Sequence, residues 1–111
     1  MAKYQIERRT PRYHFAVDVT VTDLLHRIQI KARTNTLGLL GCGIDTARPL
    51  AQGTGVRVRM KHRGAEVKAL GMVVYSRPDV EMGISFIHIE NEDERILDLW
   101  MLELMCTEMT R

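Results

Sequence analysis

The residues with the clearest chemical character lie near the start of the chain, in the stretch ERRTPRYHF. Arg8, Arg9 and Arg12 crowd around Pro11 there. A guanidinium group is planar and carries several donors, so it can hold a phosphate or the edge of a guanine base through paired hydrogen bonds. Pro11 restricts its own φ and biases Thr10 toward extended conformations, which lowers the ordering cost of binding. The stretch therefore predicts either a basic arm for an anionic partner or a solvated basic terminus.

The charge of the chain is divided unevenly along its length. Residues 90–111 carry a net charge of −5, so the remaining residues carry +7 to give the formal net charge of +2. A basic body favours a phosphate-bearing partner. Solvated strand faces beside an acidic surface helix would explain the same charges without any partner, so both interpretations stay open at this point.

Sequence patterns typical of catalysis and metal binding are missing. Ser76 and Ser85 are the only serines, and neither lies in a Gly-x-Ser-x-Gly elbow. The chain has no His-Glu-x-x-His, P-loop or dinucleotide-binding glycine pattern. Its four histidines have no metal-ligand spacing. The sequence therefore predicts no enzyme, no catalytic residue, no metal site and no cofactor.

A single cytoplasmic domain is expected. The length of 111 residues suits one domain with its own core. Charges interrupt every apolar run, and residues 1–10 lack the apolar region of a signal peptide. Cys42 and Cys106 are far apart in the sequence and are both expected to be buried, as free cysteines usually are.

The elements that must hold the arginines are mainly strands. Polar and apolar residues alternate over three stretches, and three further apolar stretches read as strands; together they cover residues 13–21, 27–33, 36–46, 56–61, 67–76 and 81–89. The motif HRGAE predicts a hairpin turn around Gly64, and RPD predicts a turn at Pro78. Six strands at this spacing predict an all-β fold, a small closed or partly closed antiparallel barrel.

One helix is predicted at the C-terminal end. Asn91 is the expected N-cap, with Glu94 as its capping-box partner and further acidic residues in the first turn. Ile96, Trp100 and Leu104 then recur at helical spacing. This apolar stripe should pack the helix against the barrel.

The spacing R-x-x-x-R of Arg8 and Arg12, followed later by TLGLLG, resembles the two motifs of the PilZ domain family, R-x-x-x-R and D/N-x-S-x-x-G. The stretch MGISF also looks like a late strand of that family. The resemblance implies a six-stranded antiparallel PilZ-like β-barrel with one C-terminal α-helix. It implies a flexible basic arm at residues 1–12, a barrel at residues 13–90 and a helix at residues 91–106. The single PilZ-like domain then covers residues 7–106.

The PilZ family binds the bacterial second messenger cyclic di-GMP, so the resemblance implies a cytoplasmic signalling receptor for that nucleotide. The implied ligand-binding residues are Arg8, Arg9, Arg12, Thr36, Gly38 and Gly41. Thr36 stands where the family has Asp or Asn, and Gly38 stands where it has Ser. Asn35 would point to the opposite face of a regular strand from Thr36.

Two functions follow from this resemblance. The first is a cyclic di-GMP receptor module that signals to an unknown downstream protein. The second is a degenerate PilZ-like domain that binds no nucleotide and acts as a protein-interaction module in motility, pilus or surface-attachment regulation. A nucleic-acid polymer is not expected as a partner, because the aromatic content is 5% and stacking platforms need exposed rings. A membrane partner is not expected either.

Overall fold

The structure is a computed structural model that describes residues 12–109, so Arg8 and Arg9 lie outside the described residues. The elements are β1 (Arg12–His14), β2 (Asp18–Asp23), β3 (Gln29–Gly38), β4 (Gly41–Asp45), β5 (Gly55–His62), β6 (Ala65–Arg77), β7 (Glu81–Ile89) and α2 (Asn91–Met109). No helix in this part of the chain has the length and apolar character that crossing a membrane requires.

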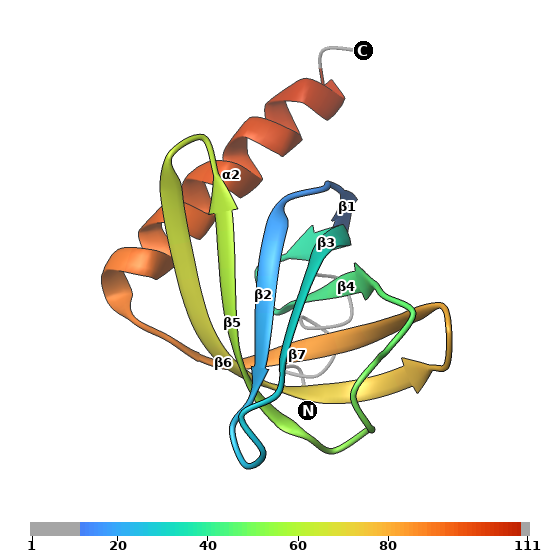
Figure 1. Cartoon of the computed structure of the whole chain (residues 1–111). Coiled ribbons are helices and arrows are strands. Elements are labelled where there is room, and N and C mark those ends of the chain that lie inside the picture. Colours follow the sequence, from blue (N-terminus) through green and yellow to red (C-terminus); the bar gives the residue numbers. More distant parts are fainter. Residues whose placement is uncertain (1–11, 110–111) are drawn as a thin grey trace, which may run out of the picture.

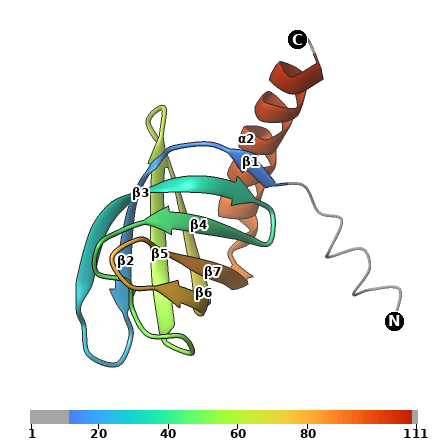
Figure 2. The ribbon, with the colours of Figure 1, turned by 90° about the vertical axis from the view of Figure 1, so that its right-hand side faces the viewer.

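Strands β2 to β7 close into a six-stranded antiparallel barrel with α2 beside it (Figure 1, Figure 2). Neighbouring strands follow the order β3-β2-β5-β6-β7-β4, and pairing between β3 and β4 closes the ring. The short strand β1 pairs with the end of β3. The predicted all-β barrel with one C-terminal helix is therefore confirmed.

The alternating residues of the strands separate the core from the surface. Val19 and Val21 of β2 and Val58 and Met60 of β5 are buried inside the barrel. Arg59, between two of them in the sequence, is exposed on the outer face. Removing each apolar side chain of this size from water contributes about 1.5–3 kcal/mol to folding. The period of two is thus the main determinant of which way each strand faces.

Helix α2 packs on the barrel through one side. Leu97, Trp100 and Met101 are buried there. The ring of Trp100 meets the ring of His62 edge-on, with 5.4 Å between centroids, and His62 meets Phe15 in the same way at 4.8 Å. These three rings join the helix to the end of β5 and to the segment that follows β1.

The start of α2 differs from the prediction. The backbone N–H of Glu94 donates to the carbonyl oxygen of Glu90 at 2.8 Å, so Glu90 occupies the N-cap position. The predicted cap at Asn91 is wrong, because Asn91 is already the first helical residue. The helix then continues to Met109, whereas the sequence suggested an end near residue 106.

The two cysteines differ in burial. Cys42 is buried, as expected, whereas Cys106 is exposed on α2. The expectation for Cys106 was wrong for a geometric reason. It follows the buried Met101 by five residues, which places it about 140° around the helix from that side chain.

Candidate functional site

Strand β1 brings the end of the arginine arm beside the second predicted segment. The register of β1 and β3 pairs Arg12 with Gly38 and His14 with Thr36. Strand β4 begins soon after, at Gly41. Of the six predicted ligand-binding residues, the structure therefore brings together the four that it describes, while Arg8 and Arg9 lie outside the described residues.

Gly41 lies next to the guanidinium group of Arg12. A Cβ atom at position 41 would lie 3.2 Å from Nη2 of Arg12 and would run into the carbonyl oxygen of Ile84 on β7. Gly41 is buried and Arg12 is exposed. The guanidinium therefore lies close to bare backbone and remains open to solvent, a position from which it could bind an anion.

Replacing Gly41 by alanine is expected to lower the free energy of unfolding by about 1–3 kcal/mol, because overpacking here forces strands apart. The new Cβ would meet a backbone oxygen, which cannot move without disturbing the pairing of β4 with β7. Gly55→Ala is the matched control, since its Cβ would meet only Cδ1 of Leu24, at 3.9 Å. Urea unfolding of both variants measures the difference, and equal stabilities would contradict the close approach at Gly41.

A β-bulge in β3 changes the geometry around Thr36. Thr34 pairs with Ile44 and Thr36 pairs with Gly43, so Asn35 is the extra residue. A Cβ at Gly43 would run into Oδ1 of Asn35 and would lie 2.8 Å from Oγ1 of Thr36. Both side chains thus lie over Gly43. The expectation that Asn35 faces away from Thr36 was wrong, because a bulge interrupts the alternation of a regular strand.

The amide nitrogen of Asn35 is already bound. Its Nδ2 donates to Oδ1 of Asp45 at 2.7 Å and to Oε1 of Glu81 at 3.1 Å. These bonds tie β3 to β4 and β7 at the bulge. Sequence reasoning missed Asn35 as a neighbour of Thr36. The available signal was Gly43, whose lack of a side chain leaves space for both neighbours.

Cys42 lies directly after Gly41 and is fully buried. Burial raises the pKa of its thiol to about 12, and the positive charge of Arg12 acts in the opposite direction. The thiol is therefore protonated at neutral pH and serves as a small apolar side chain in the core.

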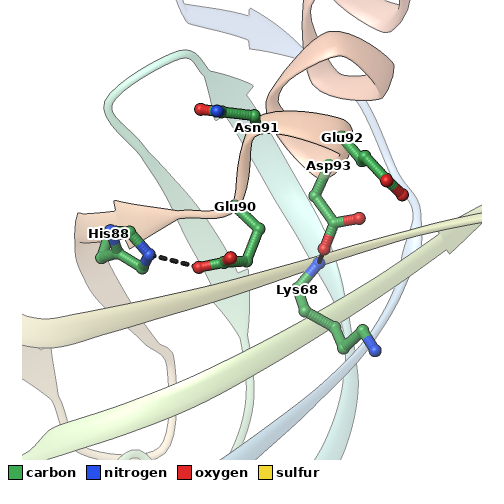
Figure 3. A pocket seen from close by; sticks show the side chains of 6 residues that line it. All are labelled: Lys68, His88, Glu90, Asn91, Glu92 and Asp93. Atoms are coloured by element: carbon green, nitrogen blue, oxygen red, sulfur yellow. Dashed lines mark hydrogen bonds and ion pairs between the residues drawn. The ribbon is translucent and has the colours of Figure 1, made fainter.

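A separate hollow lies at the start of α2 (Figure 3). It is lined by Lys68, His88, Glu90, Asn91, Glu92 and Asp93, and none of the predicted site residues belongs to it. The backbone N–H of Lys68 donates to Oδ2 of Asp93 at 3.0 Å, which attaches α2 to β6. Nε2 of His88 lies 2.6 Å from Oε2 of Glu90. Its carboxylates make this hollow a poor place for an anionic ligand.

Comparison with known proteins gives one family and several structures. A family model described as PilZ domain matches residues 6–103. The inhibitor of motility MotI/DgrA of Bacillus subtilis superposes with a TM-score of 0.74 at 14% identity, covering 90% of this chain and 52% of that chain. The PilZ domain of CeSA from a cellulose-synthesizing bacterium gives 0.66 at 18% identity, covering 89% and 99%.

A third solved structure is the PilZ domain of YcgR from Escherichia coli with c-di-GMP. It superposes with a TM-score of 0.70 at 18% identity and covers 91% of this chain and 93% of that chain. At these identities the structures show a shared fold. The chain spans about half the length of the Bacillus protein. A comparison with curated proteins gave no significant match.

Proposed function

The chain belongs to the PilZ domain family, and from this premise we propose that it is a receptor module for cyclic di-GMP. The observation that carries the proposal is the position of the Arg12 guanidinium beside the backbone of Gly41. A cation beside the backbone of a glycine suits a flat, doubly phosphorylated ligand, which can approach that backbone while its phosphate meets the guanidinium. The c-di-GMP in the YcgR structure supports this choice of ligand.

The chemistry of the ligand assigns roles to the proposed residues. Phosphate groups accept paired, charge-assisted hydrogen bonds from a guanidinium, and the O6/N7 edge of guanine accepts a similar pair. Arg8, Arg9 and Arg12 are the proposed donors, with the arm (1–12) closing over the barrel (13–90). Thr36, Gly38 and Gly41 form the proposed floor. Cyclic di-GMP is an intracellular messenger, which agrees with the cytoplasmic location that we propose. The proposed role of the domain is regulatory rather than catalytic.

Isothermal titration of cyclic di-GMP into the protein tests this function. We expect saturable binding that weakens as salt rises from about 50 to 300 mM, because part of the affinity is electrostatic and is screened. The ligand should also raise the thermal unfolding midpoint, since it binds the folded state. Absence of both heat and stabilisation would contradict the proposal.

A second candidate function is a protein-interaction module that binds no nucleotide. The observation that favours it lies at the base-reading positions. Gly38 has no side chain, and Nδ2 of Asn35 already donates hydrogen bonds to Asp45 and Glu81. In the described part of the floor a guanine would then meet the hydroxyl of Thr36 and Oδ1 of Asn35, but no carboxylate at position 36. On this alternative, the barrel would act through a protein partner in motility, pilus or surface-attachment regulation.

Restoring the motif of the family separates these two candidates. The double variant Thr36→Asp, Gly38→Ser is expected to bind cyclic di-GMP about tenfold more tightly than the unaltered protein, because a carboxylate accepts from N1–H and the N2 amine of guanine. Thr20→Asp on the outer face of β2 adds the same charge away from the proposed floor and should produce no gain. Titration calorimetry measures all three proteins. An unchanged affinity in the double variant would contradict the alignment of Thr36 and Gly38 with the motif.

A further inference from the structure

The loop between β2 and β3 holds apolar side chains in solvent. Leu25 is 82% exposed, Ile28 is 52% exposed and Leu24 is 43% exposed. Single exposed apolar residues are ordinary, but three at one hairpin tip form a patch. Figure 1 and Figure 2 both show this loop at one end of the barrel, with the C-terminal end of α2 at the other.

The loop is held in this conformation by hydrogen bonds. Oδ1 of Asp23 accepts from the backbone N–H groups of Leu25 at 2.9 Å and His26 at 3.1 Å, and the carbonyl oxygen of Asp23 accepts from Arg27 at 2.8 Å. The bond from the His26 amide, the contact of His26 Nδ1 with Oδ2 of Asp23 at 3.0 Å and the bond from the Leu25 amide lower the pKa of Asp23, so the carboxylate remains an acceptor at neutral pH. The backbone N–H of Leu24 also donates to the carbonyl oxygen of Gly55 at 3.1 Å, which fastens the tip to β5.

The apolar surface continues from the loop onto the outer face of β6. Cδ1 of Leu24 lies 3.9 Å from where a Cβ would stand at Gly55, and Gly55 pairs with Met72. Leu70 and Val74 flank Met72 on the same face, and all three are exposed. The tip and this part of β6 therefore form one apolar end of the barrel.

A band of cations borders this apolar end. Arg57 pairs with Leu70 on one side and with Thr22 on the other. A hollow beside them is lined by four cations, Arg27, Arg57, Arg59 and Lys68, and by no carboxylate. Arg59 is paired with Glu66, but the other three form no ion pair within residues 12–109. Figure 3 shows the ammonium group of Lys68 directed away from Asp93.

We propose that this end of the barrel docks on a bilayer of anionic phospholipids, with Leu24, Leu25 and Ile28 in the apolar interface. Arg27 and Arg57 would then contact the lipid phosphates. Rows of outward-facing residues on a strand are about 7 Å apart, and interfacial apolar faces penetrate about 5–10 Å, so the cations would lie at headgroup depth. The carboxylates of Glu92 and Asp93 lie beside Lys68 at the start of α2, so the lipid contacts are assigned to Arg27 and Arg57 and not to Lys68.

A projecting tip suits a deformable interface better than a rigid protein partner, which would need a matching groove. The residues involved come from β2, β5, β6 and a loop, so they meet only in the folded barrel. Hydropathy along the chain detects spanning segments and cannot detect such a surface. The inference is independent of cyclic di-GMP, because the Arg12 region contributes none of these residues.

Co-sedimentation with vesicles tests the proposal. The full chain should sediment with vesicles of equal parts phosphatidylglycerol and phosphatidylcholine and should stay in solution with phosphatidylcholine alone. Leu25→Ser should lower the partition coefficient about tenfold, since one large apolar side chain no longer enters the interface. Arg57→Gln should lower it about fivefold, which is the usual effect of one cation near an anionic surface.

Two exposed residues elsewhere provide matched controls. Leu99→Ser changes a leucine on α2 that is 59% exposed, and Arg48→Gln removes an exposed cation between β4 and β5. Both controls should bind vesicles as the unaltered protein does, and circular dichroism should show all four variants folded. Failure of the unaltered chain to bind anionic vesicles, as expected if an acidic protein is the true partner, would overturn the proposal. Equal losses in Leu99→Ser and Leu25→Ser would also overturn it.

Discussion

Arg12→Ala is expected to weaken cyclic di-GMP binding by about 10- to 100-fold, which is the usual effect of losing hydrogen bonds to a charged group. Arg12 is exposed, so its removal should leave the barrel stable. Arg12→Lys keeps the charge but loses the planar pair of donors, and its affinity should fall between those of Arg12→Ala and the unaltered protein. Titration calorimetry at low salt measures the three dissociation constants.

The control for this experiment is Arg48→Ala, an equal loss of charge at another exposed position. It should bind the ligand with little change, because it lies on the connection between β4 and β5. Matching thermal midpoints would show that the variants are folded. Unaltered affinity in Arg12→Ala would rule out Arg12 as a ligand residue, and the same pair of measurements on Arg8→Ala and Arg9→Ala would then locate the cation.

The largest effect on stability is expected from Trp100→Ala, which should lower the free energy of unfolding by about 3–5 kcal/mol. Trp100 is only 4% exposed and lies between the barrel and α2, where its ring meets that of His62. A loss of this size is a large part of the about 5–15 kcal/mol that a small domain has in total. The helix should consequently detach at lower denaturant concentration.

Urea unfolding followed by circular dichroism measures this loss, because Trp100 is the only tryptophan and its fluorescence disappears in the variant. Leu99→Ala is the matched control on the same helix. Leu99 is 59% exposed, so its truncation should change the free energy of unfolding by about 0.5 kcal/mol or less. Similar stabilities of the two variants would mean that α2 contributes little to the fold through Trp100.

The alternation of polar and apolar residues predicted the strands well where the face of each residue, buried or exposed, depends only on its neighbours in the sequence. The alternation of Val56, Val58 and Met60 matches their burial in β5. The predicted hairpin turn is also confirmed, since Arg63 and Gly64 both have positive φ values, 51° and 78°, between paired strands. Such features depend on a few consecutive residues and can be read directly from the sequence.

Features that depend on residues distant in sequence were not predicted. The alternation after Tyr13 reads as one strand, yet β1 and β2 are separate and pair with opposite ends of β3. Between them, the backbone N–H of Val17 donates to the buried hydroxyl of Thr34 at 2.9 Å. The bulge at Asn35 likewise depends on Gly43 across the sheet. The proximity of Arg12 to Gly41 was expected only from the family resemblance, because nothing in either local stretch specifies it.

The pairing of β4 with β7 has a consequence for the newly made chain. Gly41 pairs with Ser85, and the carbonyl oxygen of Ile84 lies where a side chain at position 41 would stand. A ribosome adds about 5–20 residues per second, so β4 leaves it several seconds before its partner strand. Until β7 arrives, the edge of β4 is unpaired and the floor of the proposed site has no support. The floor of the proposed site is therefore complete only after β7 (Glu81–Ile89), and with it nearly all of the barrel, has been translated.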